Sequence, residues 1–481
     1  MGKALLVAAI DFAKAFDSVD RGQLIRALMK YKCDHQLIDI IAGLYNGDTT
    51  NLYINSSEIG RVEVKSGIRQ GCTGSPWLFV MVLNQLIDRI VQSRIGFKND
   101  GFYIPMLFYA DDGLLLASSI EDMERMLRMV TMAADDIGMK MNKEKSDILI
   151  YGMKEKPQKI EGVNVVNRIR YLGVTVSDTW ECFSVYKNDK IQMAQRMSNL
   201  TYSVIARSCN KLLIGKTYWK SVVMPSLLFA SSAIPWNKTE LQKLQRAENS
   251  VWRHILGAPG YAPVTAMRGD IGASCMNARD MKTKLKYVRY IMRGSNELLK
   301  SVFKDIFNKN KDKLIRIISE YMSDLKFSGM SDFMSINESE LERRINEYDE
   351  KMWIEEINEK STLVLYRCFK TNIQEESFYD NTMESSLLFR ARSNTLKLGW
   401  RKRYENENVK CQLCDLEEET QEHFIEKCPR LRNIRREHEM EGIEMAEILC
   451  FTGNRNVEDN KTFLGAMWKN RGRLLKEQEI L

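Results

Sequence analysis

The sequence lacks the features of secreted and membrane-spanning proteins. Its first residues are apolar up to Ile10, but Asp11 and Lys14 end this run too early for a signal peptide. No apolar run approaches the length that crosses a bilayer. The ten cysteines are mostly isolated along the chain, which suits a reducing compartment. These absences predict an intracellular protein, nuclear or cytoplasmic, with no membrane partner.

A strong excess of one charge is also absent. The chain has 71 Lys and Arg against 64 Asp and Glu, a net charge of +7. Such a mild basic excess permits a polyanionic partner without requiring one. Hydrophobic residues make up 44% and charged residues 28% of the 481 positions. This composition is typical of a globular protein with two to four domains.

The first candidate site residue is Asp11, which ends an apolar run that predicts a buried strand over residues 4–10. A carboxylate at that position is costly unless it is paired or bound to a metal. A helix is expected from about Arg21 to Tyr45, and Asp17, Ser18 or Asp20 fits its N-cap better than Asp11 does. Asp11 is therefore a candidate metal ligand.

A second candidate is the pair Asp111 and Asp112. Apolar runs over Ile104–Tyr109 and Leu114–Ala117 predict a buried hairpin, with Asp-Asp-Gly forming its tight turn because Asp-Gly tolerates positive φ. Adjacent carboxylates repel one another, and burial raises the pKa of at least one. A divalent cation such as Mg²⁺ would relieve the conflict. An ordinary solvated turn is the alternative, and the turn alone does not decide.

A glycine-rich loop, residues 66–76, forms the third candidate. It follows a predicted hairpin of Asn51–Ile54 with Val62–Lys65 and opens a helix that runs to about Val91. Its three glycines allow the backbone to approach a ligand closely, and a helix N-terminus favours anions. A plain loop before a proline-started helix is the alternative.

The middle of the chain is predicted to be mostly helical. After a helix at Glu121–Ile137 and strands at 147–151 and 169–176, residues 189–256 and 276–357 have helical patterns, with a domain boundary expected at Gly257–Pro263. Basic and aromatic residues in the first of these stretches could hold a nucleic-acid backbone, although basic residues more often form a solvated face and tryptophans more often lie in the core. The residues concerned are Arg196, Arg207, Lys211, Lys216, Lys220, Trp219, Trp236 and Trp252.

The spacing C-x₂-C-x₈-H-x₄-C near the C-terminus predicts a zinc knuckle. Only four histidines occur in the chain, so chance coincidence is a weaker explanation than a ligand set, and free thiols are the alternative. The ligands would be Cys411, Cys414, His423 and Cys428. Flanking basic residues could contact nucleic acid, although stabilisation of a small subdomain by zinc is the minimum claim. These residues are Arg390, Arg392, Lys397, Arg401, Lys402, Arg403, Arg430, Arg432, Arg435 and Arg436.

Three segments resemble the A, B and C motifs of reverse transcriptases, in the family's order: D-F-A-K-A-F-D-S-V-D from Asp11, S-G-I-R-Q-G-C-T-G-S-P from Ser66, and F-Y-A-D-D from Phe108. The sequences of these three motifs are most similar to those of the LINE-type (non-LTR) retrotransposon enzymes. The later segments N-K-E-K-S and Y-L-G-V resemble motifs D and E of the same family. The resemblance implies an α+β fold: a palm with an antiparallel sheet and packed helices (1–180), a helical thumb (181–258), a helical connection (259–384) and a C-terminal region with the zinc knuckle (385–481).

The resemblance also assigns roles to single residues. Asp11, Asp111 and Asp112 would be the catalytic carboxylates and hold two Mg²⁺ ions, with Mn²⁺ as the alternative. Phe16 would exclude a 2′-hydroxyl from the incoming sugar. The remaining implied roles are the nucleotide and template pocket for Gln70 and Gly71, assistance to the leaving pyrophosphate for Lys145 or Lys143, and support of the primer end for Tyr171–Gly173.

The implied function is an RNA-directed DNA polymerase, a nucleotidyltransferase that uses an RNA template, a DNA primer and dNTPs. Only ten residues precede Asp11. We therefore expect the basic fingers region and the endonuclease of this family to be missing, with weaker nucleotide binding as the consequence. One alternative is a catalytically silent, nucleic-acid-binding remnant of such an element. Another is an RNA-directed RNA polymerase, which should lack Phe16 at the sugar gate.

Overall fold

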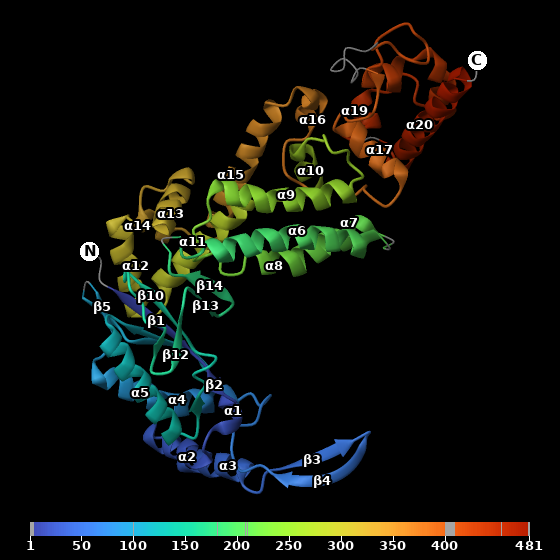
Figure 1. Ribbon diagram of the computed structural model, residues 1–481. Helices are drawn as coiled ribbons and strands as arrows, with labels where there is room; N and C mark the ends of the chain where they lie inside the picture. The colour runs from blue at the N-terminus through green and yellow to red at the C-terminus, as the bar shows by residue number, and fades with distance from the viewer. Residues whose placement is uncertain are drawn as a thin grey trace. The chain divides into compact units, whose positions relative to one another are not determined.

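The computed structural model describes residues 4–99, 101–179, 181–206, 208, 210–399, 409–453 and 455–479. The chain divides into two compact units, Met1–Tyr186 and Lys187–Leu481. Figure 1 shows the strands gathered in the first unit and helices throughout the second. No helix within the described ranges is both long and apolar enough to cross a membrane. The finer boundaries expected at residues 180, 258 and 384 stay predictions.

Unit 1 is built on a six-stranded sheet in the order β11-β12-β10-β1-β8-β7, with four two-stranded pairs beside it. Neighbouring strands run antiparallel except for β10 and β12, which are parallel, a pair that the expected antiparallel palm sheet did not include. The strands are β1 (Leu5–Ile10), β2 (Phe12–Ala13), β3 (Thr49–Ile54), β4 (Ser57–Glu63), β5 (Phe97–Asn99), β6 (Phe102–Ile104), β7 (Met106–Tyr109), β8 (Asp112–Ala117), β9 (Lys140–Met141), β10 (Asp147–Tyr151), β11 (Lys159–Ile160), β12 (Val163–Val166), β13 (Arg168–Tyr171) and β14 (Val174–Ser177).

In the described part of unit 1, five helices are complete: α1 (Ala15–Ser18), α2 (Arg21–Lys30), α3 (His35–Tyr45), α4 (Ser75–Ser93) and α5 (Ile120–Asp136). A sixth helix, α6 (Ser184–Ala206), begins at the end of this unit. The single helix expected from Arg21 to Tyr45 is wrong. Lys32 adopts φ 54° after α2, and the Asp34 carboxylate then accepts a hydrogen bond from the Gln36 amide, which caps a new helix.

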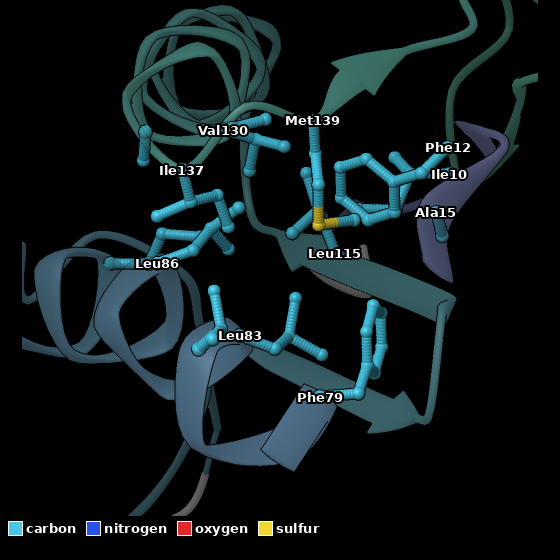
Figure 2. Packing of buried hydrophobic residues seen from close by; sticks show 14 of the residues in the cluster. Ile10, Phe12, Ala15, Phe79, Leu83, Leu86, Leu115, Val130, Ile137 and Met139 are labelled. Carbon is cyan, nitrogen blue, oxygen red and sulfur yellow. The ribbon is translucent and has the colours of Figure 1, made fainter. Parts of the chain in front are cut away.

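Both faces of the central strand β1 are covered, which explains its uninterrupted apolar sequence. Leu6, Ala8 and Ile10 point into the main core with the helices, while Val7 packs on the opposite face with Ile169 of β13. Figure 2 shows the main core, where Phe79, Leu83 and Leu86 of α4 and Val130 of α5 surround Leu115 of β8. The mixture of a covered sheet and helices confirms the predicted α+β class.

Unit 2 is helical and includes a π-helical turn at Trp219–Val223. Its other helices are α7 (Lys211–Tyr218), α8 (Met224–Leu227), α9 (Lys238–Ile255), α10 (Val264–Ile271), α11 (Met276–Arg293), α12 (Glu297–Lys309), α13 (Lys313–Asp324), α14 (Met330–Ser335), α15 (Glu338–Asn358), α16 (Val364–Phe369), α17 (Met383–Arg392), α18 (Arg432–Glu437), α19 (Met445–Ile448) and α20 (Val457–Glu479), with 3-10 turns at Ser361–Leu363 and Pro429–Leu431 and a π-helical turn at His423–Lys427. Trp219, Trp236 and Trp252 are fully buried. They are therefore core residues, the commoner of the two roles weighed from the sequence.

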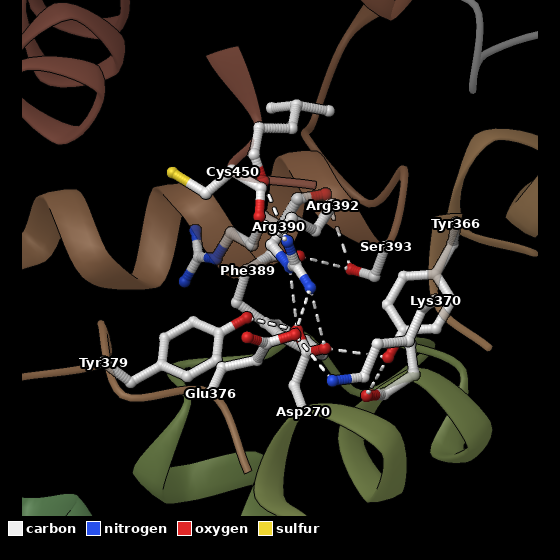
Figure 3. A network of polar contacts seen from close by, with 12 residues as sticks. Asp270, Tyr366, Lys370, Glu376, Tyr379, Phe389, Arg390, Arg392, Ser393 and Cys450 are labelled. Carbon is white, nitrogen blue, oxygen red and sulfur yellow. Dashed lines mark hydrogen bonds and ion pairs between the residues drawn. The ribbon is translucent and has the colours of Figure 1, made fainter. Parts of the chain in front are cut away.

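A buried polar network joins α10 to α17 within unit 2 (Figure 3). Asp270 accepts hydrogen bonds from Arg392 Nε at 3.0 Å and Nη2 at 3.1 Å, and from the Tyr366 hydroxyl at 2.8 Å. The Arg392 guanidinium also donates to the Leu449 carbonyl and to Glu376. Because both charged side chains of the central pair are fully buried, the network links the C-terminal region to the preceding helices.

Candidate active site and zinc cluster

Asp11 lies directly after β1, and the turn that precedes β10 holds its backbone. The amide of Asp11 donates to Ser146 Oγ at 3.1 Å, and its carbonyl accepts from the Asn142 amide at 2.8 Å. Ser146 is fully buried, and its hydroxyl donates in turn to the Asn142 carbonyl. These contacts fix the direction in which the Asp11 side chain leaves the sheet. Sequence reasoning missed Ser146, because its partner lies 135 residues earlier in the chain.

Asp111 and Asp112 lie at the tip of the β7–β8 hairpin, as predicted, but the turn differs. It consists of Ala110 and Asp111, since Tyr109 pairs with Asp112, and Ala110 has the positive φ, 53°. Strand β7 is an exposed sheet edge, with Tyr109 69% exposed, rather than a buried strand. The expectation of a buried strand over Ile104–Tyr109 and of an Asp-Asp-Gly turn is therefore wrong, whereas the second strand of the hairpin, β8, is largely buried as expected.

Gly113 is required by packing instead of by the turn. A Cβ atom there would lie 2.5 Å from Phe108 Cε1 and 2.7 Å from Ile10 Cγ1. The glycine thus allows β8 to pair closely with both neighbouring strands, and Ile10 of β1 lies opposite it. Asp11 and Asp112, which adjoin this pair in an antiparallel register, therefore lie at the same end of the two strands. The three predicted carboxylates therefore gather at one end of the sheet.

The electrostatics of this end of the sheet agree with that placement. Partial desolvation, followed by the charges of Asp111 and Asp11, raises the pKa of the Asp112 carboxyl. Oxygen donors of this type suit Mg²⁺, which would offset the mutual repulsion. Among the described residues, the group of three or more potential ligands that lies close enough together to hold one metal ion is the C-terminal cysteine and histidine cluster.

The glycine-rich loop docks on the segment that follows Asp11. The Gly67 amide donates to the Val19 carbonyl and the Ile68 amide to the Phe16 carbonyl, each at 2.8 Å. Gly67 has φ +87°, and a Cβ atom there would lie 2.7 Å from the Asp17 carbonyl oxygen. This close approach, which only glycine permits, brings the two predicted motifs into contact.

Phe16, the predicted sugar gate, is held by a ring stack. Its ring lies 4.4 Å from that of Phe79 on α4, with 13° between the planes. Beside it, Gln70 Nε2 donates to Asp17 Oδ1 at 3.0 Å, and both residues line an open cleft of about 790 Å³. Gly71 is exposed in the same loop, with φ +84°.

Arg21 fastens the base of the β3–β4 hairpin to this cleft. Its guanidinium donates to the carbonyls of Val64, Tyr45 and Gly67 and forms an ion pair of 2.9 Å with Asp48. A hydrogen bond from Arg69 is the largest influence that lowers the pKa of Asp48. No local sequence pattern indicated this network, because its members lie on three separate segments, around residues 21, 45–48 and 64–69.

The remaining predicted palm residues occupy different environments. Lys143 Nζ donates to the Glu161 carbonyl at 2.9 Å, whereas Lys145 is exposed. Tyr171 ends β13, and Leu172 and Gly173 form a tight hairpin turn with positive φ at both positions. Partial burial, followed by the charge of Asp112, raises the pKa of Tyr171, which places this residue near the carboxylates.

The predicted zinc ligands of unit 2 converge. The ligand atoms of Cys411, Cys414, His423 and Cys428 all lie within 4.8 Å of one another. Cys414 Sγ is 3.4 Å from His423 Nε2, and the Sγ atoms of Cys411 and Cys428 are 3.9 Å apart. The neighbouring Cys428 thiol lowers the pKa of Cys411 to about 5. Three sulfur donors and one imidazole nitrogen fit a tetrahedral Zn²⁺ site.

Two neighbours of the cluster were not predicted. His423 Nδ1 lies 3.1 Å from a carboxylate oxygen of Glu417, which leaves Nε2 facing the cysteines. Arg435 is 4% exposed, and its Nη2 donates to the Cys428 carbonyl at 2.6 Å while Nη1 has no hydrogen-bond partner. Three thiolates, one neutral imidazole and Zn²⁺ would sum to one negative charge, which the Arg435 guanidinium would balance.

Several basic residues that were predicted to contact nucleic acid have structural roles. Arg392 and Arg435 are buried, and Arg390 donates to the Gly257 carbonyl. Lys216 is also buried, and it forms an ion pair with Glu375. Arg392, Arg435 and Lys216 therefore cannot form an exposed basic surface, and that part of the expectation is wrong, whereas Arg390 is only half-buried. Arg207 and the cluster Arg401, Lys402 and Arg403 lie outside the described residues.

The first unit belongs to a known class. Residues 1–176 match the family model described as reverse transcriptase (RNA-dependent DNA polymerase). The match spans the sheet, the glycine-rich loop and the aspartate hairpin, so unit 1 contains a reverse transcriptase domain. The family predicted from the three motifs is confirmed.

Particular relatives are retrotransposon proteins. The chain is 29% identical over 241 residues to a retrovirus-related Pol polyprotein from type-1 retrotransposable element R2 of Nasonia vitripennis, covering 45% of this chain and 23% of that protein. It is also 29% identical over 268 residues to the R2 polyprotein of Popillia japonica, covering 53% and 43%. The chain thus spans less than half the length of these relatives. Because both relatives are proteins of R2 retrotransposable elements, the reverse transcriptase domain of this chain is of the LINE type.

A solved telomerase structure from Candida albicans, in complex with a TWJ fragment of telomeric RNA, is a more distant match. The identity is 12%, and the match covers 75% of this chain and 48% of that one with a TM-score of 0.33. That score is too low to support a conclusion about either unit.

Proposed function

We propose that this chain is an RNA-directed DNA polymerase that adds dNTPs to a DNA primer on an RNA template. The observation that carries the proposal is the placement of Asp11, Asp111 and Asp112 at one end of the palm sheet, where partial burial, followed by the charges of Asp111 and Asp11, raises the pKa of Asp112. Bound Mg²⁺ ions would supply activation of the primer 3′-hydroxyl and neutralisation of the triphosphate.

The protein's own residues position the reactants in this proposal. Asp11 and Asp111 hold the two metals, with Asp112 assisting them. Phe16, stacked on Phe79, excludes a sugar that has a 2′-hydroxyl. Gln70 contacts the nucleotide or template from the cleft that it shares with Asp17.

Assignments further from the carboxylates belong to the same proposal. Lys145 is the stronger candidate for assisting the pyrophosphate, because Lys143 already donates to a backbone carbonyl. Tyr171, close to Asp112, supports the primer end. The cluster of Cys411, Cys414, His423 and Cys428 binds one Zn²⁺ and stabilises the C-terminal region.

A template–primer extension assay with Mg²⁺ tests the proposal. The intact chain is compared with the double variant Asp111→Ala plus Asp112→Ala, with dNTPs and rNTPs in parallel. We expect incorporation of dNTPs that falls by roughly 1,000-fold or more in the variant, because the metal ions lose two ligands. Equal incorporation by both chains would refute the catalytic assignment, and equal use of rNTPs would favour an RNA polymerase. RNA binding without any extension would support the silent remnant.

A further inference from the structure

A pocket at the C-terminal end of α11 is unrelated to the residues assigned above. Its volume is about 340 Å³, and its lining consists of Lys286, Arg289, Tyr290, Arg293, Gly294 and Glu338. All of these residues belong to unit 2. The sequence of this region suggested no chemistry, because residues 276–357 are helical and charged but contain no recognisable motif.

Tyr290 gives the pocket an exposed aromatic face. The residue is 70% exposed, so its ring is open to solvent. Tyr287, one helical turn earlier, stacks on it with ring centroids 6.2 Å apart and 14° between the planes. A ring that is held from one side and open on the other can stack with a planar ligand at little cost in side-chain entropy.

The positive charges of the pocket are only partly neutralised. Lys286 forms ion pairs with Glu338 at 2.6 Å and Glu342 at 2.7 Å, so these carboxylates already have a cationic partner. Arg289 and Arg293 instead donate to the carbonyl oxygens of residues 336 and 337. Within the described ranges, no carboxylate forms an ion pair with either guanidinium.

The two arginines therefore act as a local positive centre. Arg289 is 4% exposed and anchors the loop before α15, while Arg293 is exposed at the end of α11. Burial, followed by the charge of Arg293, lowers the pKa of Arg289, and Glu338 offsets this shift only in part. An anionic group bound at Arg293 would relieve this repulsion.

We propose that the pocket binds single-stranded nucleic acid, with a base stacked on Tyr290 and an adjacent phosphate on Arg293. Stacking on an open aromatic ring together with a nearby guanidinium is how sequence-tolerant single-strand sites work. The phosphate provides the anionic partner that Arg289 and Arg293 do not have among the described residues. The proposal does not rest on polymerase activity, since the pocket contains none of the palm residues.

Fluorescence anisotropy tests the site. It measures the binding of fluorescein-labelled single-stranded RNA and DNA of about 20 nucleotides to the full-length chain without dNTPs. We expect Tyr290→Ala to weaken binding about 5-fold or more, and Tyr290→Phe to retain it because the ring remains. Arg293→Ala should reduce the slope of log K against log salt by about 0.7. Arg343→Ala is the matched control, because Glu340 and Glu347 neutralise this exposed arginine.

Photo-crosslinking of RNA that contains 4-thiouridine separates this site from binding by unit 1. We expect a crosslink on the segment 287–293 that Tyr290→Ala abolishes. Because Tyr290 and Arg293 are exposed, the variants should melt at the wild-type temperature. The proposal is overturned if both variants bind like Arg343→Ala, if Tyr290→Phe loses as much affinity as Tyr290→Ala, or if α11 acquires no crosslink.

Discussion

Removing the charge of Asp270 should destabilise unit 2 strongly. In the Asp270→Asn variant, the fully buried Arg392 guanidinium loses the carboxylate that accepts two of its hydrogen bonds. Breaking a buried ion pair from one side costs about 3–5 kcal/mol. We expect about 3 kcal/mol, the lower end, because Glu376 still accepts from Arg392 at 2.9 Å.

Differential scanning calorimetry of the full chain measures this effect. A loss of about 3 kcal/mol should lower the melting temperature of unit 2 by roughly 6–12 °C, while the transition of unit 1 stays unchanged. Glu441→Gln is the matched control, because this 45% exposed carboxylate pairs with Arg432 and Arg436 at the surface. Such pairs contribute about 0–1 kcal/mol.

A double variant sharpens the test. Asp270→Asn combined with Arg392→Met removes both charges and leaves Glu376 paired with Lys370 at 2.6 Å. The double variant should recover part of the lost stability, since no buried charge remains without a partner. A shift for Asp270→Asn no larger than that of Glu441→Gln would refute the reasoning.

Two further predictions concern the palm loop and the zinc cluster. Gly67→Ala should destabilise unit 1 by about 2 kcal/mol or more in urea unfolding, because a Cβ atom at this position would collide with the Asp17 backbone. Gly71→Ala is the control, since Gly71 has a similar φ but open space around it, and this variant should cost only about 1 kcal/mol. Equal losses would contradict a role for close approach. Glu417→Gln should weaken Zn²⁺ binding by about 10-fold in chelator competition, because His423 loses the carboxylate that orients its ring. Glu422→Gln is the control and should leave Zn²⁺ binding unchanged, because it removes only an exposed ion pair with Lys427. A wild-type chain without zinc would instead refute the metal site itself.

Local sequence patterns were sufficient to predict the strand ends and the ligand spacings. Asp11 directly follows β1, and the aspartate pair lies at a hairpin tip, because uninterrupted apolar runs indicate where these strands stop. The convergence of Cys411, Cys414, His423 and Cys428 could be predicted for a similar reason, since a knuckle brings together residues that are close in sequence.

Features that depend on distant partners could not be predicted. Arg392 was predicted to lie at the surface, because its buried partner Asp270 lies 122 residues earlier in the chain. Gly113 looked like a turn residue, although its role is set by Ile10 on the neighbouring strand. The break between α2 and α3 was missed because the apolar pattern continues across it, while Lys32 leaves the helical conformation.

Single-turnover dNTP incorporation by Asp11→Asn tests the central claim most directly. Asp17→Asn is the matched control, because Asp17 lies in the same segment and contacts Gln70 instead of the other carboxylates. The account predicts a loss of roughly 1,000-fold or more for Asp11→Asn and of less than about 10-fold for Asp17→Asn. A wild-type chain that incorporates no nucleotide, or equal rates for the two variants, would contradict it.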